Sequence, residues 1–367
     1  MAFNSDIILV TGSNGRIGTA VMKALRARYD NVVGFDSKAE ENPPEGCTRI
    51  AVDIADQASM DAGLDILRAH HGPRVASVIH LAAFYSFDGT DDPRYESVTV
   101  NGTRRLLAGL KSRFKVQQFV FSSTMLVHKP AEPGVYINED WPIDPTWAYP
   151  ASKVRTEALI RAERGEVPTV MLRFAGVYDD RCHSPPLAHQ IQRIYERQIE
   201  SRLYSGSPSH GTSYIHMDDV VNSIVHTVER RAELPPEAVF LIGEPEALSY
   251  DELQHTFARL IHDESFDTIG VPGPIAKLGA WVQDNVLGQD PFIKPWMIDR
   301  AGDHYALDVS RAKEMMGWEP IHTLRQTIPK MVAALKADDV GFYRENGLTP
   351  AEWMLVNARD RAQEMKK

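Results

Sequence analysis

Two residues four positions apart, Tyr149 and Lys153 in the stretch WAYPASK, could together take a proton from an alcohol. If this stretch opens a helix, the two side chains share one face, and the ammonium group can lie beside the phenol. A neighbouring cation lowers the pKa of a tyrosine from about 10 toward the working pH. The alternative is that Tyr149 is a half-buried helix residue with a solvated lysine as its neighbour.

Hydroxyl groups stand upstream of this pair, where a hydrophobic run ends in Ser122, Ser123 and Thr124. The Thr124 hydroxyl could bridge the phenolic oxygen of Tyr149 to a substrate alcohol. The predicted catalytic residues are therefore Thr124, Tyr149 and Lys153, which would abstract a proton while a hydride leaves to a nicotinamide.

The stretch LVTGSNGRIGTAV spaces Gly12, Gly15 and Gly18 evenly between a hydrophobic run and a helical pattern. A pyrophosphate needs such a turn because its oxygens approach the backbone where no Cβ stands in the way. A tight strand-to-helix turn would also explain the glycines. Asp36, which ends the next hydrophobic run, adds a carboxylate at the spacing of a ribose contact. A carboxylate there favours NAD over NADP, whose 2′-phosphate it would repel.

Hydrophobic runs alternate with helical patterns through the first half of the chain, and these elements must position the residues above. Strands are expected at residues 6–12, 31–36, 48–54, 75–83, 117–127 and 169–178, and helices at 16–29, 57–70, 94–113 and 149–164. Short, nearly continuous apolar runs are typical of strands covered on both faces. The pattern predicts an α/β fold, a Rossmann-type doubly wound parallel sheet.

The second half is less regular, with helices expected at 186–202, 217–232, 250–262 and 322–336 and a strand at 238–244. The proline-rich segment 270–296 fits a loop-rich cap over a pocket and plain packing equally well. We expect an NAD-binding domain at residues 1–178, to which 213–245 returns. A smaller C-terminal α/β substrate domain would comprise 179–212 and 246–340, followed by an appended helix or tail at 341–367.

The formal net charge of −10 gives no basic footprint, so we expect no nucleic-acid or membrane partner. No apolar run approaches the roughly 20 residues of a membrane span, and no signal peptide is recognised. The two cysteines, Cys47 and Cys182, are expected to be reduced, which favours a cytoplasmic protein. The histidines show no metal spacing with the cysteines, so no metal is expected. A nucleophilic Cys182–His183 pair is disfavoured because no orienting acid is evident.

The motifs TGSNGRIG, HLAA, FSST, YPASK, LRFAGVY, YIHMDDV and ALDVSRAKEMMGWEP occur in an order that resembles the extended short-chain dehydrogenases/reductases, the NAD-dependent epimerase/dehydratase family. The resemblance spans roughly residues 6–330 and implies a substrate held over the nicotinamide in a cleft between two domains. It also implies a cofactor site composed of Gly12, Gly15, Arg16, Ile17 and Gly18 at the pyrophosphate, Asp36 at the ribose, Asp53 and Ile54 at the adenine, Leu81, Ala82 and Ala83 beside the nicotinamide, Thr99 and Ser122, Tyr149 and Lys153, and Phe174 and Val177 near the carboxamide.

The substrate residues implied by the resemblance are Phe84, Thr124, Gly176, Thr212 and Arg300. Arg300 matches a diphosphate-binding arginine of the family, whereas Gly176 replaces an asparagine and Thr212 a second arginine. Met125 and Leu126 replace the acidic pair of sugar 4,6-dehydratases, so that dehydration is disfavoured. Thr99 replaces an asparagine that often contacts the cofactor.

These residues predict NAD-dependent redox chemistry at a secondary alcohol, with a nucleotide-sugar epimerase as the leading function. A net dehydrogenase or reductase of a non-nucleotide sugar, steroid-like or lipid-like compound is the alternative, which Thr212 and Gly176 favour. An inactive nucleotide-sensing protein is a further alternative. The family resemblance also implies a homodimer through the helices expected at 94–113 and 149–164.

Overall fold

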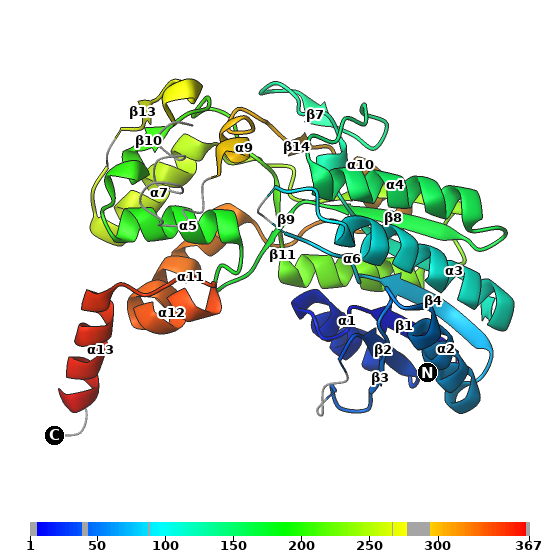
Figure 1. Ribbon diagram of the computed structural model, residues 1–367. Coiled ribbons are helices and arrows are strands. Elements are labelled where there is room, and N and C mark those ends of the chain that lie inside the picture. The colour runs from blue at the N-terminus through cyan, green and yellow to red at the C-terminus, as the bar shows by residue number, and fades with distance from the viewer. Residues whose placement is uncertain (1–5, 39–42, 87–88, 266, 277–293, 365–367) are drawn as a thin grey trace.

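The computed structural model describes residues 6–38, 43–86, 89–265, 267–276 and 294–364 (Figure 1). Its centre is a parallel sheet in the order β12-β8-β6-β4-β1-β2-β3, with β5 pairing beside β4. The strands are β1 Ile7–Thr11, β2 Val32–Asp36, β3 Thr48–Ala51, β4 Arg74–His80, β5 Lys115–Val116, β6 Phe119–Thr124, β8 Thr169–Phe174 and β12 Glu237–Ile242. Strands β2 and β3 lie on one side of β1, and β4, β6, β8 and β12 lie on the other. This order confirms the predicted doubly wound fold.

Helices cover both faces of this sheet, so alternate residues of each strand enter two separate cores. On one face lie α1 (Arg16–Arg26), α6 (Met217–Glu229) and α10 (Ser310–Met316). On the other lie α2 (Gln57–His71), α3 (Asn101–Arg113) and α4 (Ala148–Glu163). A π-helical segment, Tyr95–Val100, leads into α3.

The chain leaves the sheet just after β8, where the run expected as one strand at 169–178 is interrupted at Ala175. Its continuation, β9 (Gly176–Tyr178), pairs instead with β11 (Tyr214–His216). Two further elements are also shorter than expected. A 3-10 turn (Met125–Val127) follows β6, and α5 (Pro185–Tyr195) ends before the 3-10 turn Ile199–Arg202.

A second, smaller lobe is built from α5, α7 (Tyr250–His262), α11 (Leu324–Ala337) and α12 (Asp339–Glu345) around its own core. The small pair β10 (Leu203–Tyr204) with β13 (Ile269–Gly270) lies at its margin. The pair β7 (Tyr136–Ile137) with β14 (Ala306–Leu307) belongs to the sheet lobe, because Ile137 and Leu307 are buried in its core. The short helix α9 (Pro295–Ile298) follows the segment 277–293, so most of the expected cap at 270–296 lies outside the described residues.

The C-terminal tail is less separate than the sequence indicates. Phe342 and Tyr343 of α12 are fully buried in the second lobe, as is Met354 of α13 (Glu352–Glu364). Beyond this contact α13 runs away from the body of the molecule, as its label at the C-terminal end shows (Figure 1). Among the helices that the structure describes, none is long and apolar enough to cross a membrane.

Candidate active site

The glycine loop between β1 and α1 is packed so tightly that two of its glycines cannot be replaced without movement. Gly12 has a φ of +69°, and a Cβ there would lie 2.9 Å from the Ala82 nitrogen. A Cβ on Gly18 would lie 2.2 Å from the Gly12 oxygen. Gly15, the N-cap of α1, has an ordinary φ of −64° and is exposed at the mouth of the loop. The loop therefore presents bare backbone and a helix N-terminus, which suits a pyrophosphate.

Asp36 lies directly against this loop, because the Asn14 backbone nitrogen donates to its Oδ2 at 2.9 Å. The half-buried carboxylate ends β2, one strand away from the glycines, where a ribose would meet it. Arg16 opens α1 but reaches across to the segment after β9, where its guanidinium pairs with Asp179 at 2.5 Å. Ile17, next to it, packs partly against the core. These loop residues fit a dinucleotide, with Arg16 engaged by a carboxylate that a pyrophosphate would have to replace.

The residues expected beside the adenine and nicotinamide lie at the ends of neighbouring strands. Leu81 and Ala82 continue β4 and bond to Thr11 of β1 through their backbone nitrogens, at 3.3 Å to its carbonyl and 3.2 Å to its hydroxyl. The exposed Asp53 accepts from the Ala55 nitrogen at 2.9 Å, and Ile54 is buried.

The remaining expected contacts divide into half-buried and buried groups. Ala83 and Val177 are half-buried, whereas Phe174 is buried at the end of β8. Thr99 has no exposed surface, and its hydroxyl accepts from the Phe84 nitrogen at 2.9 Å. Thr99 therefore supports the segment that ends at Phe84 from behind, and its contact with the cofactor stays a prediction.

Tyr149 and Lys153 lie at the start of α4, whose N-cap is Trp147. The Lys153 Nζ donates to the Ser122 carbonyl at 2.8 Å and lies 5.8 Å from the centre of the Tyr149 ring. Ser122 also anchors its own side chain, since its hydroxyl donates to the His80 carbonyl at 3.1 Å. The Thr124 side chain hydrogen-bonds the Tyr149 hydroxyl. Helix α4 and the carboxyl end of β6 thus bring together the three predicted catalytic side chains.

The pKa shifts of Tyr149 and Lys153 differ from the expectation that the lysine lowers the pKa of the tyrosine. Burial raises the pKa of Tyr149 to about 12, although the hydrogen bond with Thr124 works in the opposite direction. Burial also lowers the pKa of Lys153 to about 7, while Glu157 works against that shift. Because the same burial that hinders ionisation of the phenol also removes charge from the lysine, the pair alone does not make Tyr149 acidic. A further positive charge, or a hydrogen bond to the phenolate, is needed during turnover.

A buried ion pair beneath the site holds α4 against the sheet. Glu157, one turn after Lys153, accepts from Arg173 of β8 through both of its oxygens, at 3.0 and 2.7 Å, and from the Ser123 hydroxyl at 2.6 Å. Arg173 also contacts the His128 Nε2 at 3.0 Å. Removing one member of such a pair would leave the other charge buried without a partner. The network ties α4 to β8 through Arg173 and to β6 through Ser123.

Aromatic rings surround Tyr149, and the sequence did not identify them. Tyr85 meets it edge-on with ring centres 4.7 Å apart, and Trp147 lies 5.4 Å away. Trp296 in turn packs 4.8 Å from Trp147. Tyr85 and Trp296 come from segments distant from Tyr149, so no spacing in the chain links them to it, whereas Trp147 stands two residues before it. Their rings form an apolar surface beside the Tyr149 phenol.

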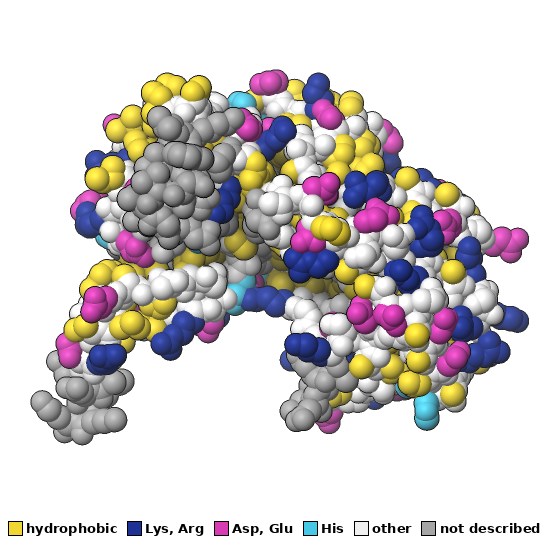
Figure 2. All heavy atoms as spheres, viewed as in Figure 1, with side chains coloured by type: hydrophobic (Ala, Val, Ile, Leu, Met, Phe, Trp, Pro, Cys, Tyr) yellow, Lys and Arg dark blue, Asp and Glu magenta, His cyan; other side chains and the backbone are white. Residues whose placement is uncertain are grey.

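A cavity of about 340 Å³ opens beside this aromatic cluster, between the two lobes. Thr212 and Arg300 both line it, together with Trp147 and Leu126 from the catalytic side and Arg193 of α5. Tyr204 and Tyr250, stacked with ring centres 3.8 Å apart, form another part of its wall. Figure 2 shows the hollow between the lobes on one face of the molecule.

Of the expected substrate residues, Phe84, Thr124 and Gly176 lie outside the lining of this cavity, although Thr212 and Arg300 are brought together. A Cβ at Gly176 would lie 2.9 Å from the Tyr214 ring, so the glycine has a packing role. The arginine of α5, Arg193, is the cationic residue that sequence reasoning missed. Its place on a helix with a polar exposed face gave no signal.

The environment of Cys182 does not suit a nucleophile, and the sequence analysis had also disfavoured that role. The thiol has no exposed surface, and burial raises its pKa to about 12. The neighbouring His183 is held instead by both oxygens of Asp179 at 2.8 Å.

The parallel sheet, glycine loop and Thr124–Tyr149–Lys153 cluster define a short-chain dehydrogenase/reductase. The model of the NAD-dependent epimerase/dehydratase family matches residues 8–243, and the chain belongs to that family. A UDP-glucose 4-epimerase of Mycolicibacterium smegmatis is 28% identical over 340 residues, which are 88% of this chain and 96% of that protein. A 3-beta-hydroxysteroid dehydrogenase of Mycolicibacterium neoaurum is 23% identical over 345 residues, 88% of this chain and 89% of that protein.

Solved structures share the fold. A UDP-glucose 4-epimerase of Thermus thermophilus in complex with NAD superposes with a TM-score of 0.66 at 21% identity, covering 90% of this chain and 98% of the other. A short-chain dehydrogenase/reductase superfamily protein from Agrobacterium tumefaciens with bound NAD gives a TM-score of 0.68 at 23% identity, covering 92% and 99%. At these identities the likeness concerns the fold alone.

Proposed function

We propose that this chain is a nucleotide-sugar epimerase that works through proton transfer by Tyr149. The observation that carries the proposal is that Arg193 and Arg300 line the same cavity as Trp147, the neighbour of Tyr149. Two guanidinium groups are suited to a diphosphate, because each can donate two parallel hydrogen bonds to phosphate oxygens. Arg193 would take the place of the second diphosphate-binding arginine, which is Thr212 in this chain. The UDP-glucose 4-epimerase among the relatives supports the same substrate class.

The proposed mechanism assigns a task to each residue at the site. When bound, NAD supplies the hydride acceptor, the hydride donor for the return step and a positively charged nicotinamide ring. Tyr149, as phenolate, would take the substrate hydroxyl proton through Thr124 and would give it back to the alkoxide of the epimer. Lys153 holds the cofactor ribose and, in its protonated form, stabilises the phenolate. Gly12, Gly15 and Gly18 would hold the pyrophosphate, and Asp36 the adenosine ribose.

A net dehydrogenase or reductase of an apolar alcohol is the second candidate. It is favoured by the aromatic wall of the cavity, which includes Tyr204, Tyr250 and Trp147, and by the absence of an arginine at Thr212. The steroid dehydrogenase among the relatives has a name that agrees with such a substrate. In this alternative Arg193 and Arg300 would lie at the cavity mouth without a diphosphate partner.

The experiment that separates these functions follows sugars and cofactor together. UDP-glucose, UDP-N-acetylglucosamine and dTDP-glucose are each incubated with the protein and NAD, and products are identified by NMR while absorbance reports reduced nicotinamide. An epimerase converts a sugar to its epimer without net growth of the reduced band. Growth of that band with a simple alcohol, and no epimer from any nucleotide sugar, would establish the dehydrogenase instead.

The diphosphate assignment has its own variant. Arg193→Ala and Arg300→Ala should each raise the KM for the nucleotide sugar at least about tenfold, because each removes a charge-assisted pair. Arg197→Ala is the matched control, since Arg197 follows α5 closely but pairs with Glu264 at 2.9 Å outside the cavity. Equal KM values for all three variants would reject the assignment.

We also propose that the protein is a cytoplasmic homodimer, formed by α3 and α4 with their counterparts in a second copy. Both helices lie on one face of the sheet and keep exposed residues on their outer sides. Light scattering at micromolar concentration should give twice the chain mass. A mass of one chain would reject the dimer without bearing on the catalytic proposal.

A further inference from the structure

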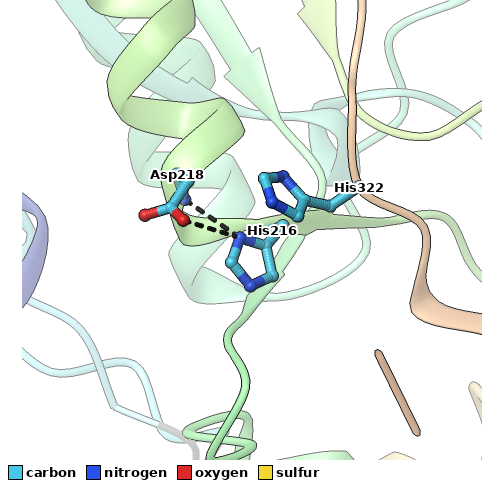
Figure 3. A group of neighbouring side chains, drawn as sticks. All are labelled: His216, Asp218 and His322. Carbon is cyan, nitrogen blue, oxygen red and sulfur yellow. Dashed lines mark hydrogen bonds and ion pairs between the residues drawn. The ribbon is translucent and has the colours of Figure 1, made fainter. Parts of the chain in front are cut away.

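Two histidines and an aspartate come together where β11 ends and α6 begins. His216 ends β11 and caps α6, Asp218 lies in the first turn of α6, and His322 precedes α11 of the second lobe. Figure 3 shows the two imidazole rings stacked, with the Asp218 carboxylate beside His216. The amino-acid sequence does not reveal this cluster, because His322 lies far along the chain from His216 and Asp218.

The spacing of the three groups is near that of ligands on one ion. One ligand atom from each residue lies within 4.8 Å of those from the others. The His216 Nδ1 and the nearer Asp218 oxygen are 3.7 Å apart, whereas two ligands on one tetrahedral zinc ion are about 3.4 Å apart. The rings of His216 and His322 have centres 4.2 Å apart at 22°, so binding requires a modest turn of one ring. Asp218 and His322, with side chains 68% and 30% exposed, are the members able to adjust.

Each histidine also presents its other nitrogen to a carboxylate. The His322 Nδ1 lies 3.1 Å from Asp219 Oδ2, which the His322 backbone nitrogen also contacts at 2.9 Å. The His216 Nε2 is buried without a hydrogen-bond partner and lies 3.5 Å from Asp180. A carboxylate on one imidazole nitrogen fixes the proton there and leaves the lone pair on the other nitrogen for a metal. The arrangement points to His322 Nε2 as one ligand atom, and to His216 Nδ1 as another once it gives up the hydrogen bond that it accepts from the Asp218 backbone nitrogen at 3.2 Å.

The surrounding charge favours a cation at this point. Asp180, Asp218 and Asp219 surround the two rings, and the nearby Lys330 is paired with Asp180 at 3.0 Å.

We propose that His216, Asp218 and His322 bind one divalent transition-metal ion of the zinc type, which fastens the start of α6 to the segment before α11. Imidazole nitrogens with one carboxylate suit zinc and cobalt better than magnesium or calcium, which prefer oxygen ligands. The ion lies between the sheet lobe and the second lobe and would restrain their relative movement. This site is independent of the proposed epimerase activity, and it departs from the expectation of a metal-free protein.

The same residues also have an explanation that needs no metal. The His216 Nδ1 accepts from the Asp218 backbone nitrogen at 3.2 Å, which caps α6, and the ring stack could simply pack the two lobes together. The experiment must separate an ion site from a cap with a ring stack.

The test uses the full chain, stripped with EDTA and titrated with zinc chloride by calorimetry. We expect one ion per chain, and His322→Ala and Asp218→Asn should each weaken binding at least about tenfold. Cobalt chloride should give the visible absorption of a tetrahedral cobalt site in the original protein and much less in either variant. Zinc should raise the Tm of the original protein and leave that of His322→Ala unchanged.

The control is His255→Ala, because His255 lies 3.3 Å from Asp251 on α7 without a third ligand in the described chain. This variant should bind zinc as the original protein does. If His322→Ala fails to fold, the exposed Asp218→Asn decides the question. Absence of zinc binding, or binding that neither variant weakens, overturns the proposal and leaves the cap and ring stack as the role of these residues.

Discussion

The residue that matters most, Tyr149, sits in surroundings that oppose its ionisation. Burial raises its pKa to about 12, and burial lowers the pKa of Lys153 to about 7. The site therefore holds a phenol and an amine whose charged forms are both disfavoured until a cofactor adds positive charge. Proton transfer would thus be coupled to cofactor binding, since the free protein does not carry a ready phenolate.

The depressed pKa of Lys153 predicts how stability changes with pH. Between its folded value of about 7 and its ordinary value of 10.5, the unfolded chain binds one more proton than the native protein. The free energy of unfolding should therefore rise with pH in this window, by about 1.4 kcal/mol per pH unit from this residue. Lys153→Met removes the effect.

The measurement compares urea unfolding of the original protein and Lys153→Met at pH 7, 8 and 9. The difference in free energy of unfolding, original minus variant, should grow steadily over this series, whatever its sign at pH 7. Parallel pH dependences in the two proteins would mean that Lys153 keeps an ordinary pKa.

Among single residues, the sequence identified those site residues that lie on one helix face or at the end of a recognisable strand. Tyr149 and Lys153 share a helix face, and Thr124 ends a recognisable strand, so their meeting could be predicted. Tyr85, Trp296 and Arg193 could not be predicted, because they reach the site from other segments through tertiary packing. The direction of the Tyr149 pKa shift was also missed, since burial of the site, not the presence of a lysine, determines it.

Among the elements, the turn from β1 to α1 has both a packing role and a proposed binding role. Substitutions at its different glycines can test the two roles separately. A Cβ at Gly18 would meet the Gly12 oxygen at 2.2 Å, whereas one at Gly15 would meet it at 3.3 Å. Gly18→Ala should cost about 1–3 kcal/mol of stability and also weaken NAD binding.

Gly15→Ala should leave the Tm almost unchanged but weaken NAD binding, because its Cβ would stand where the pyrophosphate approaches. Thermal unfolding and NAD titration of the two variants check the separation. If Gly15→Ala binds NAD as the original protein does, the pyrophosphate does not lie on this loop.

Element boundaries were predicted less well than element types, for local reasons. The strand expected at 117–127 ends at Thr124, whose hydroxyl accepts from the Leu126 nitrogen at 3.3 Å and starts a 3-10 turn. The run 169–178 changes partners at Ala175, because its last residues pair with β11 in a separate sheet. Apolar character continues through both breaks, so hydrophobic periodicity does not reveal them.

For the whole molecule, the two lobes meet through charged contacts near the cofactor loop. Arg16 of α1 pairs with Asp179, which follows β9, and both side chains are partly exposed. If a pyrophosphate takes Arg16, this pair must break. Asp179→Asn should therefore tighten NAD binding about 2–5-fold, with a smaller effect in high salt.

Calorimetric titration of NAD at two salt concentrations checks this prediction. The variant keeps the size of the side chain, so its structure should persist. Weaker NAD binding in Asp179→Asn would mean that Asp179 positions Arg16 for the cofactor instead of competing with it.

The overall architecture was predictable because alternating strands and helices leave few ways to cover a parallel sheet. The packing of α12 was not, because Phe342 and Tyr343 stand among charged residues and are buried by tertiary contacts that include α11 and α13. The cluster of His216, Asp218 and His322 was hidden for the same reason, since tertiary contacts alone bring it together.

The most direct test of the account is the rate at which substrate reduces bound NAD in a single turnover, compared between the original protein and Tyr149→Phe. The substrate is whichever sugar or alcohol the product screen identifies, and NAD occupancy is matched in the two proteins. The account predicts a rate at least about 100-fold lower in the variant, because the phenolic oxygen that takes the proton is gone. Equal rates at equal occupancy would contradict it and remove Tyr149 from the chemistry.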